Sequence, residues 1–435
     1  MLHTPPTPLT AKQQAVLNNL RTIVKRQSRP TSLIDPSTVT ELLIQYGDLM
    51  RATGLAEELL TYLERIQDRT PADTVLYPRL LVEIAQTLDA IGGMHLGVDA
   101  TFQEAFTLFA MYPATEVHSY HAQAHLAYGR HLLNNSDFEA ALAHFQQAME
   151  MYGAMENVAD IAAVEAELGR VYLAQGDFSA AVLHFERALE GFAAEGESAV
   201  FAYTSAQTEL AMAYIQRGEI GQASQLLGDA LTVCDALELR VLRAQVLREM
   251  AYVDQTRAET VTDEKMRRRY LDEAEQRLQQ AVDDLLSHHD SLELAIAYHD
   301  LGRVEARLRK FDEAEAHVRL SIENFSRLGN RRNFAVAQIT LGQLLLVRHN
   351  DLTGATERIR QSLAIAGELG DRFTQQQAAE SLVRIHQLQV KRSKPGTVER
   401  RQAIDEIAYT LERLKRLALT PSLETLETLL IEAET

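Results

Sequence analysis

Three histidines have the spacing in this chain that best suits metal chemistry. His118, His121 and His125 stand at positions i, i+3 and i+7, which lie on one face of a helix. Imidazole nitrogens are common zinc ligands, so this face could hold a metal ion. No carboxylate or cysteine lies at a matching offset nearby, and a partly exposed helical stripe explains the same spacing. We therefore predict no metal and no cofactor, and we keep the histidine site as an alternative.

The remaining reactive residues form no catalytic pattern. The sequence has no G-x-x-x-x-G-K-[ST] loop, no G-x-S-x-G elbow, no H-E-x-x-H pair and no G-x-G-x-x-G after a strand. Cys234 is the single cysteine, so it cannot form an internal disulfide, and we expect a buried structural thiol. The sequence predicts a protein that is not an enzyme.

The composition favours helices and an acidic surface. Alanine, leucine, glutamate, glutamine and arginine dominate, tryptophan is absent, and only 10 of the 435 residues are proline. The formal net charge of −18 disfavours binding to nucleic acid and to anionic membranes. The sequence has no run of about 18 apolar residues, which is the length that a membrane-spanning helix needs. The N-terminus does not have the pattern of a signal peptide, so we expect a cytoplasmic protein.

The sequence contains an internal repeat, which predicts the helices on which the side chains discussed above lie. One copy reads Leu168-Gly169, Tyr172, Gly176-Asp177, Phe178, Ala181, Phe185, Ala188. Related patterns begin at Tyr128, Leu210, Leu301 and Leu341, at intervals such as the 40 residues from Gly129 to Gly169. Apolar residues at i, i+3, i+4 and i+7 in both halves predict a helix–turn–helix hairpin.

Each repeated position has a physical reason. A glycine after the leucine, as at Gly169, lets two helices approach closely because no bulky side chain separates them. Gly176 tolerates the positive φ that ends the first helix, and Asp177 can cap the second. Alanines such as Ala181 keep the second helix close to the first, and the large Phe185 fills the remaining space.

This pattern of small and large residues resembles the tetratricopeptide repeat family, most strongly from Ala122 to Ala366. The resemblance implies an all-α fold, an α-solenoid built as a right-handed superhelix of antiparallel helix–turn–helix repeats. The early tryptophan and the terminal proline of that family are absent here, and the period exceeds its usual length of about 34 residues. The chain is most similar to a long-period subclass, with a repeat of about 40 residues, seen in kinesin light chain and in bacterial signalling regulators.

The repeat pattern divides the chain into four expected segments. These are an N-terminal tail and helix (1–36), degenerate helical repeats (37–115), the tetratricopeptide-like array (116–390) and C-terminal capping helices (391–435). Helices are expected at Thr10–Arg26, Thr38–Met50, Leu55–Ile66, Leu76–Ile91, Val98–Phe109, Arg372–Val390, Thr397–Leu417 and Ser422–Glu432. About eleven extra residues around Glu259–Arg269 form either an exposed loop or extended helix ends.

In the resembling family the first helices of the repeats line a concave groove that holds a partner. Arginines recur at one groove position, and acidic residues recur one turn earlier, in Glu167, Glu209, Glu249 and Asp300. Arginine can grip a carboxylate or a backbone carbonyl. Alternatively, Glu167 with Arg170 and Asp300 with Arg303 pair along their own helices. The predicted groove residues are Arg130, Asn134, Glu167, Arg170, Glu209, Arg248, Glu249, Tyr252, Asp300, Arg303 and Gln343.

These features predict a scaffold or regulatory subunit that binds a protein or peptide partner in the groove. The alternative is a peptide-gated bacterial signalling switch that acts on a separate effector. From Arg384 to Arg416, nine Lys and Arg residues stand against four Asp and Glu. This basic region could be a solvated cap, a docking site for an acidic partner, or a surface for self-association.

Overall fold

The computed structural model describes residues 15, 18–24, 35–52, 55–91, 97–135, 137–286 and 292–416. Every regular element in these residues is a helix, which confirms the predicted all-α class. No helix of the described residues is long and apolar enough to cross a membrane. The chain forms two compact units, of which unit 1 comprises residues 1–260 and 280–291, and unit 2 comprises residues 261–279 and 292–435.

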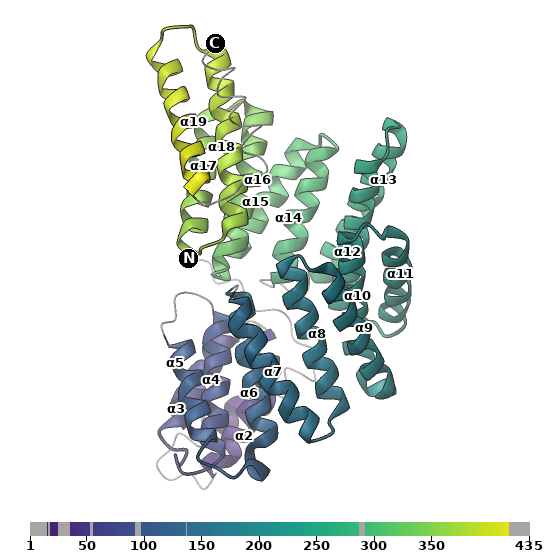
Figure 1. Cartoon of the computed structure of the whole chain (residues 1–435), viewed down its shortest axis with the longest axis vertical. Helices are drawn as coiled ribbons and strands as arrows, with labels where there is room; N and C mark the ends of the chain where they lie inside the picture. Colours follow the sequence, from purple (N-terminus) through teal and green to yellow (C-terminus); the bar gives the residue numbers. More distant parts are fainter. Residues whose placement is uncertain are drawn as a thin grey trace. The chain divides into compact units, whose positions relative to one another are not determined.

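Unit 1 is a run of helices in which each helix packs on its neighbours in sequence (Figure 1). The pairs α6 and α7, α8 and α9, and α10 and α11 form hairpins, and each hairpin packs on the next. Its helices are α2 (Pro36–Ala52), α3 (Ala56–Gln67), α4 (Leu76–Ile91), α5 (Val98–Phe109), α6 (Ala114–Asn134), α7 (Phe138–Ala154), α8 (Val158–Gln175), α9 (Phe178–Ala194), α10 (Val200–Gln216), α11 (Ile220–Ala236) and α12 (Arg240–Thr260), with a 3-10 turn at Gly196–Ala199.

Unit 2 repeats the same hairpin construction (Figure 1). Helix α14 packs on α15, α16 on α17 and α18 on α19, and α15 and α17 also pack on the helices that follow them. The unit contains α14 (Leu292–Arg307), α15 (Phe311–Arg327), α16 (Arg331–His349), α17 (Leu352–Glu368), α18 (Arg372–Arg392) and α19 (Val398–Arg416). Helix α13 (Glu264–Leu285) contributes residues to both units. These stacked hairpins are an α-solenoid.

Close approach of paired helices depends on the predicted glycines. A Cβ atom built on Gly169 would lie 2.8 Å from the ring of Phe185, and one on Gly129 would lie 2.5 Å from the ring of Phe145. In unit 2, a Cβ on Gly302 would lie 2.7 Å from Val318. Carbon atoms in contact prefer about 3.5–4.0 Å, so any side chain at these positions would separate the helices. The predicted reason for the small residues is therefore confirmed.

The turns between paired helices also follow the predicted chemistry. Gly176 has φ +81°, and the carboxylate of Asp177 accepts a hydrogen bond of 3.0 Å from the backbone N–H of Ala180. The corresponding Gly218 has the same φ, but the side chain of Glu219 makes no capping bond to α11. Glutamate has one more methylene than aspartate and rarely serves as an N-cap.

The structure resolves several open points outside the clear repeats. The predicted helices from Thr38 to Phe109 correspond to α2–α5. The extra residues around Glu259–Arg269 are extended helix ends, because α12 continues to Thr260 and α13 begins at Glu264. In the expected first helix, residues 18–24 are helical, and the last expected helix, at 422–432, lies outside the described residues.

Candidate functional site

The predicted arginines and glutamates of unit 1 meet between consecutive first helices. Nε of Arg130 on α6 lies 2.6 Å from Oε1 of Glu167 on α8. Arg170 on α8 reaches the same Glu167 oxygen at 2.6 Å and, through a second nitrogen, Oε1 of Glu209 on α10 at 2.6 Å. Its Nε lies 2.9 Å from both Glu209 oxygens. We call Arg130, Glu167, Arg170 and Glu209 the charged ladder.

Burial divides the charged ladder into supporting and exposed members. The side chain of Glu167 is 2 % exposed, whereas those of Arg130 and Arg170 are 49 % and 38 % exposed. Burial opposes ionisation of Glu167, but the charges of Arg170 and Arg130 outweigh it and hold the pKa of this carboxyl below its usual value. Glu167 is therefore inaccessible to a partner in solution, and it serves to hold the two guanidinium groups in place.

The pKa of Glu209, at the end of the charged ladder, depends on a different balance between burial and neighbouring charges. Burial raises its pKa, the Arg170 guanidinium lowers it, and the neighbouring Glu167 carboxylate raises it again. The net direction is upward. Arg170 thus bonds to Glu167 along its own helix and to Glu209 on the next helix. The alternative drawn from sequence, that Glu167 and Arg170 pair along their own helix, occurs here together with ion pairs between first helices.

The other predicted residues of unit 1 flank this ladder. Asn134 is exposed at the end of α6. On α12, Arg248 and Glu249 are half-buried, and Tyr252 is 37 % exposed. The side-chain amide of Gln216 on α10 donates to the hydroxyl of Tyr252 at 3.4 Å, which continues the contacts between first helices.

The predicted residues of unit 2 lie on the first helices α14 and α16, and the contact of Gln343 is neutral. The amide of Gln343 on α16 donates to Oγ of Ser381 on α18 at 3.3 Å. Between the preceding pair of first helices, Nε2 of His299 on α14 lies 2.9 Å from Oγ1 of Thr340 on α16. Arg303 is exposed and Asp300 is half-buried on α14. Asp300, Arg303 and Gln343 belong to unit 2, whereas the charged ladder belongs to unit 1.

A second charged contact between first helices was missed from sequence. Arg51 on α2 forms an ion pair with Glu83 on α4 and donates to Oγ1 of Thr87 at 3.2 Å. Burial raises the pKa of Glu83 to about 7, although the charge of Arg51 lowers it. A Cβ on Gly47 would lie 1.6 Å from Oε1 of Glu83, so the glycine leaves room for this carboxylate. The sequence feature that could have indicated this contact is a small residue, Gly47, one helical turn before Arg51.

Two of the three histidines considered for metal binding, His121 and His125, belong to an aromatic cluster, and the third, His118, is half-buried on the same helix. His125 stacks on Phe106 with ring centroids 4.5 Å apart, and its Nδ1 lies 2.8 Å from Nδ1 of His144 on α7. His121 stacks on Phe109 at 5.3 Å. Burial lowers the pKa of His125 to about 3, so the ring is neutral at physiological pH. Within the described residues, no group of three His, Cys, Asp or Glu side chains could hold a metal ion.

The single cysteine matches its predicted role. Cys234 on α11 is fully buried, and burial raises the pKa of its thiol to about 11. A thiol that remains protonated is a poor nucleophile. Cys234 therefore belongs to the core of unit 1.

The comparisons with known proteins agree with this repeat geometry. Residues 120–194, which include α7, α8 and α9, match the tetratricopeptide repeat family. Residues 120–194 contain tetratricopeptide repeats. No curated protein sequence shows significant similarity to the chain. The residues matched are those in which the small and large positions and the capping aspartates are most regular.

Three solved structures with tetratricopeptide-like folds align with most of the chain. A Rap protein complexed with competence and sporulation factor has 13 % identity and a TM-score of 0.55, over 92 % of this chain and 98 % of its own. The Rap conjugation regulator of plasmid pLS20, complexed with the Phr* peptide, has 15 % identity and a TM-score of 0.50, over 88 % and 97 %. Human IFIT1 with m7Gppp-AAAA has 13 % identity and a TM-score of 0.56, over 98 % and 87 %. At these identities the similarity concerns the fold.

Proposed function

We propose that the chain is a protein-interaction scaffold that binds a peptide or an extended protein segment along its first helices. The supporting observation is the charged ladder, in which half-exposed arginines recur at one position of consecutive helices and a buried glutamate holds them. A guanidinium has five N–H donors, so an arginine that is paired with a carboxylate can still bind carboxylate or carbonyl oxygens of a partner. The solved Rap structure with the Phr* peptide shows that a related fold holds a peptide.

The proposed contact residues have distinct roles. Arg130 and Arg170 grip acceptors of the partner, while Glu167 and Glu209 hold the guanidinium groups in their orientation. Tyr252 adds a half-exposed aromatic surface. The remaining contacts proposed in unit 1 are Asn134, Arg248 and Glu249, and those proposed in unit 2 are Asp300, Arg303 and Gln343.

A clean test must separate binding from folding. Removing Arg130 and Arg170 alone would leave the buried Glu167 without a counter-charge, and an unpaired buried charge is strongly destabilising. We therefore choose a neutral ladder that combines Arg130→Gln, Glu167→Gln, Arg170→Gln and Glu209→Gln, so that no carboxylate of the ladder loses its counter-charge. Its amide groups replace the ion pairs with neutral hydrogen bonds of similar shape.

The test uses a peptide selected on the wild-type chain from a random library and measured by fluorescence anisotropy. We expect the neutral ladder to bind at least about tenfold more weakly, because charge-assisted contacts to the partner are lost. The control combines Arg187→Gln and Arg319→Gln, on the second helices α9 and α15, with side chains that are 52 % exposed in both cases. Equal affinities for the neutral ladder and the wild type would reject the proposed site.

The finer proposal is a peptide-gated switch that acts on a separate effector. Its support is the similarity of nearly the whole chain to two Rap proteins, one complexed with competence and sporulation factor and one with the Phr* peptide. A switch must favour different conformations with and without the peptide. Small-angle scattering of the full chain should then show a change in radius of gyration on peptide binding, whereas an unchanged curve at saturation would leave only the passive scaffold.

A further inference from the structure

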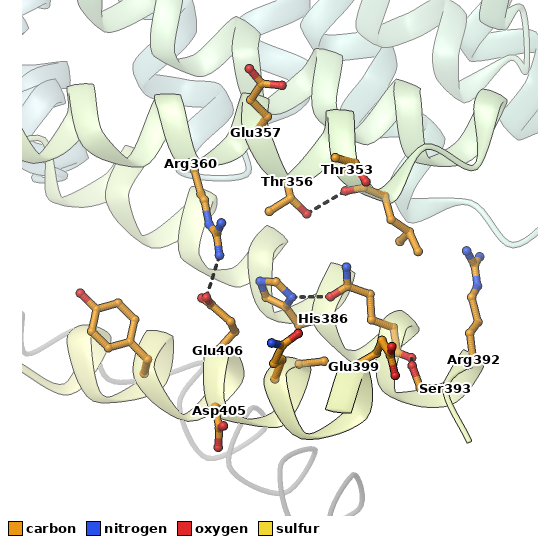
Figure 2. Close-up of a pocket in the computed structure, with 15 residues that line it drawn as sticks. Thr353, Thr356, Glu357, Arg360, His386, Arg392, Ser393, Glu399, Asp405 and Glu406 are labelled. Carbon is orange, nitrogen blue, oxygen red and sulfur yellow. Dashed lines mark hydrogen bonds and ion pairs between the residues drawn. The ribbon is translucent and has the colours of Figure 1, made fainter. Parts of the chain in front are cut away.

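A groove lined by many polar side chains lies on unit 2, between α17, α18 and α19. It has a volume of about 1180 Å³ and is lined by four acidic side chains and two arginines. Its lining residues on α18 and α19 come from the region that is basic in sequence, yet acidic side chains outnumber the arginines in the whole lining. Figure 2 shows the side chains on the three helices. The residues that carry the argument are Arg360, His386, Glu399 and Glu406.

His386 presents an unsatisfied hydrogen-bond acceptor at this groove. The ring is only 4 % exposed, and its Nδ1 lies 2.7 Å from Oε1 of Gln389. An amide oxygen accepts only, so Nδ1 carries the hydrogen, and Nε2 of the neutral ring is an acceptor. Among the described residues Nε2 has no hydrogen-bond partner. An unpaired buried acceptor disfavours the structure unless a donor reaches it.

A weak ion pair joins two walls of the groove beside this ring. A guanidinium nitrogen of Arg360 on α17 lies 2.9 Å from Oε1 of Glu406 on α19, as Figure 2 shows. The side chains are 51 % and 43 % exposed, so water and salt screen the attraction. The pair can open at little cost, which would free the Glu406 carboxylate for another cation.

We propose that this groove is a second binding site and that it takes a lysine-bearing peptide segment. The lysine ammonium displaces Arg360 from Glu406 and donates a hydrogen bond to Nε2 of His386. The displaced guanidinium of Arg360 moves into solvent and makes no contact with the peptide. The acidic lining, including Glu399, favours a ligand that carries positive charge.

Two observations select this ligand. A volume of about 1180 Å³ exceeds the space that a single free amine fills, and it accommodates a peptide segment of several residues. The acceptor of His386 is recessed, since the ring is 4 % exposed. An ammonium on a four-carbon stem is slimmer than a planar guanidinium, so lysine reaches this acceptor better than arginine does.

The test measures binding of capped, fluorescein-labelled hexapeptides of glycine and serine to the full chain by anisotropy. One peptide carries two lysines, a second carries two arginines and a third carries two norleucines, and spermidine serves as a free-amine competitor. We expect the lysine peptide to bind most tightly, followed by the arginine peptide, with no measurable binding of the norleucine peptide. Equal binding of the lysine and norleucine peptides would overturn the proposal, and so would full displacement of the peptide by an equimolar amount of spermidine.

Two substitutions in the groove should change the affinity for the lysine peptide in opposite directions. Glu406→Gln should weaken the lysine peptide about tenfold, because a charge-assisted bond becomes a neutral one. Arg360→Gln should strengthen binding several-fold, because the competing guanidinium is gone. The matched control is Glu412→Gln, an exposed glutamate of α19 outside the groove, which should change nothing.

A further variant tests the recessed acceptor. His386→Leu removes Nε2 and should weaken the lysine peptide while leaving the melting temperature the same or higher, since an unpaired acceptor is replaced by an apolar group. If Glu406→Gln and Glu412→Gln have the same effect on affinity, or if Arg360→Gln weakens binding, the proposed mode of binding is wrong.

Discussion

The first helices of the two units make the same kind of contact with different chemistry. In unit 1 the contact is the charged ladder, with Arg130 and Arg170 on either side of a nearly fully buried Glu167. In unit 2 the equivalent positions hold Gln343 with Ser381. A neutral contact at these positions is compatible with helix stacking, although Arg332 on α16 also forms an ion pair of 3.2 Å with Asp371, the N-cap of α18. This comparison is the reason that we take the charged ladder of unit 1 as the main contact of the proposed partner-binding site.

The largest effect is expected from removing one cation of the charged ladder. Arg170→Ala leaves Glu209 and the buried Glu167 with less counter-charge and should lower the free energy of unfolding by about 3 kcal/mol. Arg303→Ala, at the same repeat position of unit 2 but exposed, should change it by less than about 0.5 kcal/mol. Chemical denaturation of both variants measures the difference, and equal values would contradict the contrast between the units.

A somewhat smaller effect, similar in both units, is expected from overpacking. Ala181 on α9 and Ala314 on α15 occupy the same repeat position, and both are fully buried. Replacing either with leucine should cost about 1–3 kcal/mol, because the paired helix has no space for the larger side chain. The exposed Ser179→Leu is the control on α9. A neutral Ala181→Leu would show that the assigned repeat register is wrong.

The pH dependence should differ in sign between two carboxyl groups. Glu83 in unit 1 has a pKa that is raised in the folded state to about 7. Its contribution to the free energy of unfolding is therefore fully present below its unfolded pKa, near 4.5, and is lost as the pH rises through 7. Glu315 in unit 2 is buried, but hydrogen bonds from Arg319, His349 and Arg348 lower its folded pKa to about 2. Its contribution is present above about 4.5 and is lost as the pH falls toward 2.

Thermal melts of Glu83→Gln and Glu315→Gln at pH 3, 5 and 8 separate these contributions. Glu83→Gln should reduce the fall in melting temperature between pH 5 and 8, because the variant has no proton to lose in that window. Glu315→Gln should leave that window unchanged and reduce the fall between pH 5 and 3. The same response from both variants would contradict the difference between the two carboxyl groups.

The smallest effect is expected from the neutral contact of unit 2. Gln343→Ala removes one 3.3 Å hydrogen bond of an exposed side chain and should change the free energy of unfolding by about 0.5 kcal/mol or less. Differential scanning calorimetry measures this change. A loss comparable to that of Arg170→Ala would mean that polar contacts between first helices stabilise both units equally.

Local rules accounted for much of the fold before any coordinates were considered. The glycine and alanine positions, the Gly176 turn and the Asp177 cap each depend on residues close together in sequence, or on a period that repeats many times. These features predicted the hairpins and their boundaries. The same rules failed for Arg51 and Glu83, because the repeats at the N-terminus have lost the small and large pattern that would align them.

The candidate site was predicted less completely than the fold. Sequence placed Arg130 and Arg170 in one row and Glu167 in another, and it left open whether the arginines bind a partner or whether Glu167 and Arg170 pair along their own helix. The structure shows that pair, over 3 residues, and also a pair between Arg130 and Glu167, over 37 residues, which sequence did not indicate. The contact between His125 and His144 likewise required two helices to be packed before their rings could meet.

The sequence alone determined that this is an array of paired helices, because helix periodicity and the need for small residues at close contacts are properties of each repeat. Only the tertiary structure decided which side chains are buried and which remain open to a partner. Burial of Glu167 and exposure of Arg130 depend on how one hairpin packs on the next. The residues of a single repeat do not determine that packing.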